Sequence, residues 1–324
     1  MKILENVESY KVCEPLFEGV RVIMSYLGEK YSPQYIQGIA GASFRVATGC
    51  PSRPTCCYMM WPTDLIKLLG YEYTEHPCVG PDNENLTSEM INAVKNQIDL
   101  GKPSFVWHAM TSCEWDVVCG YDDVDGLFYG RGSCQGVEGM GYHSEPWDRA
   151  AKAAEMCVAF GAVNIGAKTS EFDYRQAEIA ALLDAVRHAR TVKEKPEDGG
   201  WYSYEGLQAL RKWSVAFSNP GKDRDLADAY CFSIYHSTHC TASGFLKEIA
   251  GHFPGKAENL LLEAAKYMHE EAIAFTSCAP YLGWSSPWGI DEDRSRAVAP
   301  LLGRTADLYE KAIEKIELAL ENIR

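Results

Sequence analysis

The sequence has little positive charge and no long apolar run, and each absence excludes a class of partner. It contains 31 Lys and Arg residues against 45 Asp and Glu residues, which gives a formal net charge of −14. An acidic chain without a basic patch repels nucleic acid and anionic membranes. No stretch approaches the roughly 20 consecutive apolar residues of a membrane-spanning helix. We therefore expect neither nucleic acid nor a membrane as a partner.

The first twenty residues also lack the pattern of a secretory signal. Glu5 and Glu8 interrupt the segment in which such a signal carries its apolar stretch. This indicates a cytoplasmic protein, in which the 12 cysteines are expected to be thiols rather than disulfides. Cys50, Cys56 and Cys57 lie close together, but they form no C-x-x-C pair and no histidine follows at zinc-finger spacing. We expect no metal and no cofactor.

The composition, with 46% hydrophobic and 23% charged residues, is that of a chain that buries a core. A length of 324 residues suggests two domains. Apolar runs bounded by Gly and Asp predict strands at 104–108, 115–121 and 127–130. Helical periodicity predicts helices at 63–69, 88–100, 172–189, 202–217, 226–249, 257–275 and 298–323. We therefore predict an α+β protein with a small antiparallel sheet in a domain over 1–168, an all-α helical domain over 169–324, and a loop at 193–200.

Cys13 lies at the start of a further predicted helix. Apolar residues recur at helical spacing from Leu16 to Leu27, while Pro15 suits the first turn and Gly28 the end. Amides and the dipole at a helix N-terminus stabilise a thiolate and can bind an oxyanion. Cys13 is therefore a candidate nucleophile, although a small buried cysteine would fit the same position.

Several short motifs resemble one known family. They are the run from Cys13 to Gly28, then GKPSFVW, VVCGYDD and LFYGRG in the first half, and GLQALRKW and ASGFLKEIA in the second. Together they resemble the papain-like fold of bacterial bacteriocin-leader peptidases, and most of all the two-domain proteins similar to butirosin-biosynthesis protein H. The resemblance implies a papain-like cysteine-peptidase-related domain followed by a helical domain. It also implies acyl transfer to an amine, with Cys13 as nucleophile, rather than protein cleavage.

The chain departs from this family at the partner of the cysteine. Alignment of the family's G-Y-D on Gly120 to Asp122 places Glu114 where the family has its histidine. A carboxylate beside a thiol raises the thiol pKa, which opposes nucleophilic attack. The usual Asp or Asn of the return strand is also missing, because Gly130, Arg131 and Gly132 occupy that region.

Two hypotheses follow from this departure. The first is a cysteine-dependent acyltransferase or hydrolase that acts on an amide or thioester of a small molecule, in which Glu114 binds the amine of the acceptor. The second is a non-catalytic protein whose cleft binds a small ligand or peptide. Neither is an endopeptidase, since amide cleavage needs an acid that protonates the leaving amine.

Two histidines are candidate substitutes for the missing base. His108 ends the strand before Glu114, and His143 lies in the segment GMGYHSEPW. A surface or supporting role suits either histidine as well, because a catalytic pair is defined by geometry. Asp122 and Asp123 are interpreted as residues of a hairpin turn.

The second half holds two further groups of candidate residues. His236, His239 and Cys240 share a helix face, with a His-Glu-Glu run at 269–271. They could bind zinc, or they could form an interhelical polar network or a domain-interface patch. The absence of an H-E-x-x-H pattern favours the network or the patch over zinc. The aromatic loop WSSPWG, residues 284–289, could line a pocket or fill the gap between helix ends.

Overall fold

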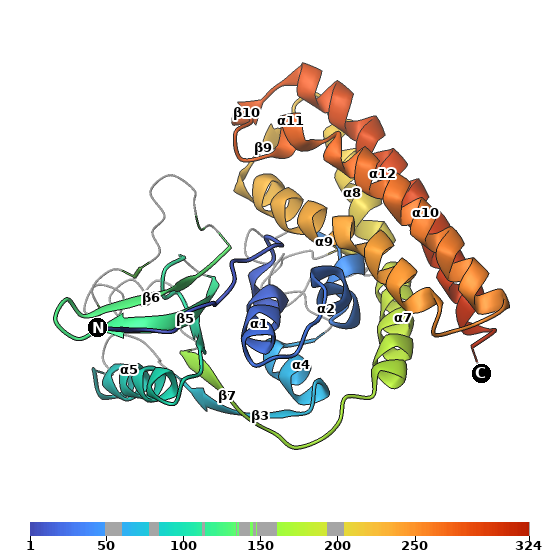
Figure 1. Cartoon of the computed structure of the whole chain (residues 1–324). Helices are drawn as coiled ribbons and strands as arrows, with labels where there is room; N and C mark the ends of the chain where they lie inside the picture. Colours follow the sequence, from blue (N-terminus) through green and yellow to red (C-terminus); the bar gives the residue numbers. More distant parts are fainter. Residues whose placement is uncertain are drawn as a thin grey trace. The chain divides into compact units, whose positions relative to one another are not determined.

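The computed structural model describes residues 1–48, 60–77, 84–111, 114–133, 135, 143–144, 147, 161–192 and 204–323. The protein is α+β and divides into two compact units, and Figure 1 labels most of their elements. The first unit comprises Met1–Ile36 and Trp61–Asp173, and the second comprises Gln37–Met60 and Tyr174–Arg324. The loop expected at 193–200 and the group of Cys50, Cys56 and Cys57 lie outside the described residues.

An antiparallel sheet forms the centre of the first unit. In the described part of the chain its order is β1-β5-β4-β7-β3, and β6 pairs with β5. The strands are β1 (Lys2–Ile3), β3 (Tyr71–His76), β4 (Ser104–Trp107), β5 (Trp115–Asp122), β6 (Leu127–Arg131) and β7 (Ala162–Lys168). β4, β5 and β6 confirm the three predicted strands, whereas β1, β3 and β7 were not predicted.

Helices α1 (Pro15–Tyr26) and α5 (Glu84–Asp99) cover opposite faces of this sheet. Side chains alternate between the faces of a strand, so neighbouring residues of β4 contact different helices. Val106 packs with Val94 of α5. The adjacent Phe105 contacts α1 at Gly19, where a Cβ atom would collide with its ring. The close approach of α1 to the sheet therefore requires glycine at this position. The unit also contains α4 (Pro62–Leu68), and α2 (Pro33–Ile39) spans the boundary between the units.

The second unit is mainly helical. Its long helices are α7 (Tyr174–Arg190), α8 (Gly206–Phe217), α9 (Leu226–Ala250), α10 (Lys256–Thr276) and α12 (Glu292–Leu320), with the short α11 (Ala279–Leu282) and the 3₁₀ helix η1 (Ala42–Phe44). α12 packs along α10, α8 and α7, and α10 packs on α9. Among the described residues, no helix combines the length and the apolar character needed to cross a membrane.

The prediction of an all-α second domain is wrong, because this unit contains two short antiparallel ladders. β2 (Ala47–Thr48) pairs with β8 (Tyr204–Glu205), and β9 (Asp223–Arg224) pairs with β10 (Gly289–Ile290). The guanidinium of Arg224 is buried and donates to the carbonyls of Leu282, Gly283 and Ser286. These bonds hold the chain before β10 beside β9. Strands of two residues are too short to show the alternation from which strands are predicted.

A segment from the first half of the chain is built into the helical unit. The hydroxyl of Tyr309 donates to the carbonyl of Phe44 at 2.6 Å. His239 Nε2 lies 3.1 Å from the carbonyl oxygen of Arg45, and the backbone N–H of Val46 donates to His188 Nε2 at 2.9 Å. The helical unit is therefore formed by two stretches of chain, Gln37–Met60 and Tyr174–Arg324.

Candidate functional site

Cys13 is exposed and lies two residues before Pro15, the first residue of α1. The buried side chain of Glu14 caps this helix. Its carboxylate accepts the backbone N–H of Leu16 at 3.1 Å and that of Phe17 at 3.0 Å. Pro15 has no N–H to offer. The amides of the first turn that we expected to hold an oxyanion are therefore bonded to Glu14.

Tyr10 connects the start of α1 to the start of β5. Its hydroxyl donates to the carbonyl of Trp115 at 3.0 Å. Burial raises the pKa of Tyr10, and nearby carboxylates raise this pKa further, those of Asp116, Glu18, Glu14 and Glu114. The chain thus brings Glu114 into the same acidic neighbourhood as the residues that precede α1.

The loop between β4 and β5 carries both His108 and Glu114. The backbone N–H of His108 donates to the carbonyl of Glu114 at 2.7 Å, which closes the base of this loop. His108 has a left-handed backbone with a φ of 59°, and burial lowers its pKa. Glu114 is buried and lies one residue before β5 rather than on the strand. The predicted partners of Cys13 therefore belong to one hairpin loop.

Asp116, which sequence analysis missed, is the buried carboxylate that holds this loop. It accepts the backbone N–H groups of Met110 at 2.7 Å and Thr111 at 2.8 Å, together with the Thr111 hydroxyl at 2.8 Å. Burial raises the pKa of Asp116 to about 7. One signal was present in the sequence, since Asp116 interrupts the otherwise apolar strand WDVVC.

Close contacts surround the glycines of the return strand, β6, where the resembled family has its third catalytic residue. A Cβ atom on Gly132 would collide with Oδ1 of Asp116, and a Cβ atom on Gly130 would collide with the carbonyl of Val117. Arg131 donates through Nε to the carbonyl of Val7 at 3.1 Å. The two glycines therefore serve close packing around Asp116 and β5.

His143 and the Asp122–Asp123 pair lie at the far side of the β5–β6 hairpin. His143 is exposed, forms a bridge to Tyr129, and its Nδ1 lies 3.0 Å from the carbonyl oxygen of Ser144. The carboxylate of Asp122 accepts the N–H of Val124 at 2.8 Å. This hydrogen bond confirms the interpretation of Asp122 as a turn residue.

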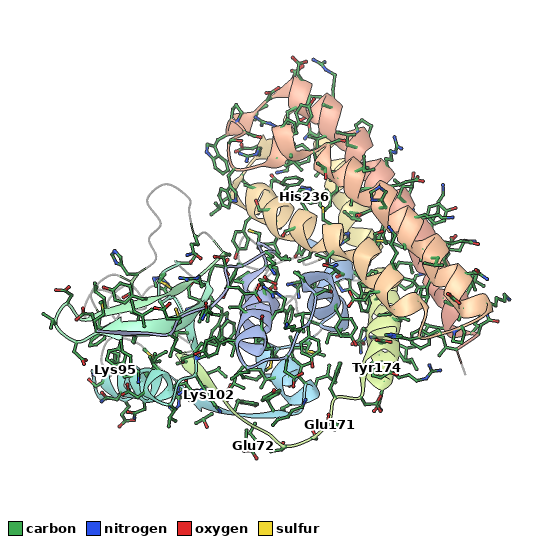
Figure 2. All side chains as sticks on the ribbon, in the orientation of Figure 1. Glu72, Lys95, Lys102, Glu171, Tyr174 and His236 are labelled. Carbon is green, nitrogen blue, oxygen red and sulfur yellow. The ribbon has the colours of Figure 1, made fainter. Side chains whose placement is uncertain are left out.

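The histidines of α9 are bonded within the helical unit. His239 is fully buried, with Nδ1 2.8 Å from Glu271 Oε1 and Nε2 facing the Arg45 carbonyl. His236, labelled in Figure 2, lies with Nε2 2.8 Å from the Thr276 hydroxyl. No group of three or more potential metal ligands occurs in the described part of the chain. Both ring nitrogens of His239 are engaged, as in the interhelical network considered above.

Two buried arginines hold the aromatic loop 284–289. Arg224 lies 4.2 Å from the ring centre of Trp288. Arg294 donates to the carbonyls of Pro287 at 2.6 Å and Gly289 at 2.7 Å. Trp284 and Trp288 nevertheless remain about half exposed, at 50% and 53%. The loop is thus fixed through its backbone while its indole rings face outward.

Comparison with known proteins returned no match, either to a protein-family model or to a curated protein.

Proposed function

We propose that the first unit is a papain-like domain that transfers acyl groups through Cys13, taking them from a thioester of a small molecule. The observation that carries this proposal is the exposed thiol directly ahead of a largely buried helix that packs on β4 and β5. Such a position lets a substrate reach the sulfur while the helix behind it stays fixed. The resemblance of the surrounding motifs to butirosin-type proteins supports the same chemistry.

The proposed reaction has two balanced steps. In the first, Cys13 Sγ attacks the thioester carbonyl, the bond to the original sulfur breaks, and the thiol proton of Cys13 leaves with the released thiol. In the second, an amine attacks the acyl-enzyme carbonyl, the bond between the acyl group and Cys13 Sγ breaks as the amide forms, and the proton lost by the amine restores the Cys13 thiol. Glu114, at the base of the hairpin loop, would bind the incoming amine as its ammonium form before the amine loses a proton. His108 is the candidate acceptor of that proton, because burial lowers its pKa and keeps its imidazole neutral.

The residues around Cys13 fit the cleavage of a peptide bond less well than the cleavage of a thioester. A leaving amine must be protonated, whereas a leaving thiolate need not be. The carboxylates of Glu14 and Glu114 oppose the formation of an anion near the start of α1. Glu14 also occupies the first helix amides, which would otherwise stabilise a tetrahedral oxyanion. A thioester has a more reactive carbonyl, so its cleavage depends less on a proton donor and on oxyanion stabilisation than the cleavage of an amide.

Glu14 occupies the first amides of α1, and this observation also favours a second candidate function. In this alternative the cleft binds a small ligand and no acyl-enzyme forms. Both functions use the same residues, so they are distinguished by whether a covalent bond forms at Cys13.

The experiment is to incubate the protein with an acyl thioester of N-acetylcysteamine and to measure the intact mass. We expect the mass of one acyl group to be added to the wild type and to be absent from Cys13→Ala. Cys240, the other exposed cysteine of the described residues, provides the control, since Cys240→Ala should acylate like the wild type. Acylation that persists in Cys13→Ala contradicts the proposal. Thioester binding without acylation in any variant supports the non-catalytic function instead.

A further inference from the structure

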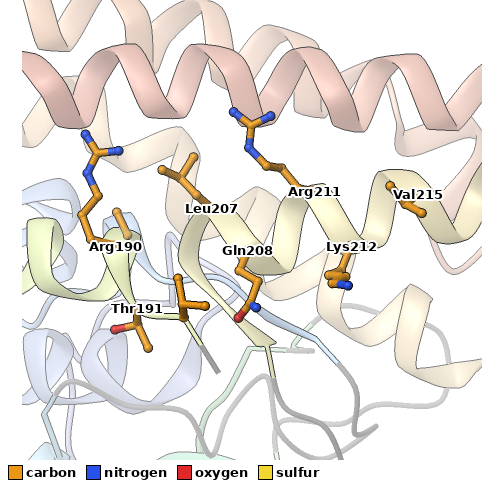
Figure 3. Close-up of a pocket in the computed structure, with 9 residues that line it drawn as sticks. Arg190, Thr191, Leu207, Gln208, Arg211, Lys212 and Val215 are labelled. Carbon is orange, nitrogen blue, oxygen red and sulfur yellow. The ribbon is translucent and has the colours of Figure 1, made fainter. Parts of the chain in front are cut away.

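The helical unit contains a cavity that is distinct from the Cys13 site. Its volume is about 430 Å³, within the range of small-molecule sites. It lies between the C-terminal end of α7 and the exposed side of α8, as Figure 3 shows. Ala189 and Leu207, both buried, form its floor, and Val192 and Val215 contribute exposed apolar rims.

The lining is mainly apolar even though two arginines belong to it. Arg190 makes a two-pronged contact with Glu317 on α12, with distances of 2.9 and 2.8 Å. Arg211 pairs with Glu310 on the same helix. Figure 3 shows both side chains directed toward α12, so their charged ends are neutralised outside the cavity. Their aliphatic stems are the parts left to line the cavity.

Lys212 is the third cation of the lining, and its ammonium group is not neutralised in this way. Its Nζ lies 5.4 Å from the ring centre of Tyr204. Among the described residues, no carboxylate oxygen lies within ion-pair distance of it. The cavity thus combines an apolar floor with one cation that lacks an anionic partner in the described chain.

We propose that this cavity binds a small amphipathic monoanion, a straight-chain fatty acid, with its chain along Leu207 and Val215 and its carboxylate at Lys212. The apolar floor supplies affinity for methylene groups. The ammonium group supplies a charge-assisted hydrogen bond to one carboxylate. Among the described residues of the lining, Lys212 is the one cation without a carboxylate partner, which fits a single negative charge, and the net charge of −14 disfavours anions that bear more.

The test uses decanoate as the probe and decanol as its uncharged counterpart, with binding to the full chain measured by titration calorimetry. We expect saturable binding of decanoate to one site. Lys212→Gln should weaken decanoate binding about tenfold, which corresponds to roughly 1.4 kcal/mol, and leave decanol binding unchanged. Lys311→Gln is the matched control, because Lys311 also lies over a tyrosine ring, that of Tyr267. It should change neither affinity.

A second variant tests the apolar part of the site without endangering the fold. Val215 is 67% exposed, so Val215→Glu should leave the structure intact while placing a negative charge at the cavity rim. We expect it to weaken both decanoate and decanol binding at least tenfold. Ile273→Glu, at a similarly exposed position on α10, should leave both affinities unchanged. An absence of saturable decanoate binding, or equal decanoate affinity in wild type, Lys212→Gln and Val215→Glu, overturns the proposal. None of these outcomes depends on acyl transfer at Cys13.

Discussion

Asp116 shows how one buried side chain arranges the loop that carries the candidate site residues. Its carboxylate accepts hydrogen bonds from Met110 and Thr111, and these bonds fix the loop between His108 and Glu114. Burial nevertheless raises the pKa of Asp116 to about 7 from its ordinary value of 3.8. The folded protein therefore favours the protonated form, so this contribution to stability is fully present below pH 3.8 and is lost as pH rises from there to about 7. The shift corresponds to about 4 kcal/mol at most.

We predict that Asp116→Asn removes most of this pH dependence. The amide oxygen of asparagine can accept the two backbone N–H groups, and its NH₂ group can donate to the Thr111 hydroxyl once that hydroxyl rotates. The free energy of opening of β4 and β5, measured by hydrogen exchange in increasing urea, should fall between pH 4 and 7 in the wild type. In the variant it should stay nearly constant over that range.

The control for this prediction is Asp125→Asn, which removes a charge from the exposed β5–β6 turn. It should retain the pH dependence of the wild type. A pH dependence of the same size in Asp116→Asn would show that another group causes it.

At the level of single residues, the sequence predicted positions better than roles. Pro15 and the apolar spacing after it placed Cys13 correctly at the start of α1. The role of Glu14 was not foreseen, because Ser, Thr, Asp and Asn are the residues typical of helix caps. Whether Glu14 turns toward the amides or toward solvent depends on burial by the sheet, which the sequence does not display.

The helix α1 and its cap determine the electrostatic surroundings of the exposed thiol. We predict that Glu14→Gln makes Cys13 more reactive, because it removes a negative charge from the residue that follows the thiol in the chain. The pH profile of Cys13 alkylation by iodoacetamide should shift to lower pH, with a several-fold faster rate at pH 7. The helix should lose about 0.5–2 kcal/mol of stability, since one amide of the first turn then loses its acceptor.

Peptide mapping by mass spectrometry would report this rate, and Cys240 in the same protein provides an internal control. Cys240 should alkylate at the same rate in both proteins, because it lies on α9 in the other unit. A slower rate at Cys13 in the variant would mean that Glu14 assists the thiol rather than opposing it.

Among whole elements, those with a long periodic apolar face were predictable. The helix expected at 226–249 is α9, Leu226–Ala250, and the one expected at 257–275 is α10, Lys256–Thr276. α12 begins at Glu292, earlier than the expected residue 298, because its charged first turn EDRSR shows no apolar period and is capped by Asp291. β3 was missed for a similar reason, since only one of its six side chains is buried.

At the scale of the whole molecule, the sequence did not reveal which stretches of the chain form the helical unit. The residues that hold the segment around Phe44 lie far away along the chain, at His188, His239 and Tyr309. They act as side chains bonded to backbone groups, and such contacts leave no periodic pattern in a sequence. The domain boundary predicted at residue 168 marks where the helical patterns become continuous, and it does not reveal that an earlier segment packs among these helices.

The hydrogen bond from Tyr309 to Phe44 offers a test of this arrangement. Tyr309→Phe keeps the ring and removes only the hydroxyl, so the buried carbonyl of Phe44 loses a donor at 2.6 Å. Leaving such a group unsatisfied costs about 1–3 kcal/mol. We expect hydrogen exchange to accelerate together in peptides from residues 42–48 and from α12, because the bond joins the two. Tyr267→Phe, on the partly exposed side of α10, should change neither peptide. Acceleration confined to α12 would contradict this expectation, because it would show that the segment around Phe44 keeps its place without the Tyr309 hydrogen bond.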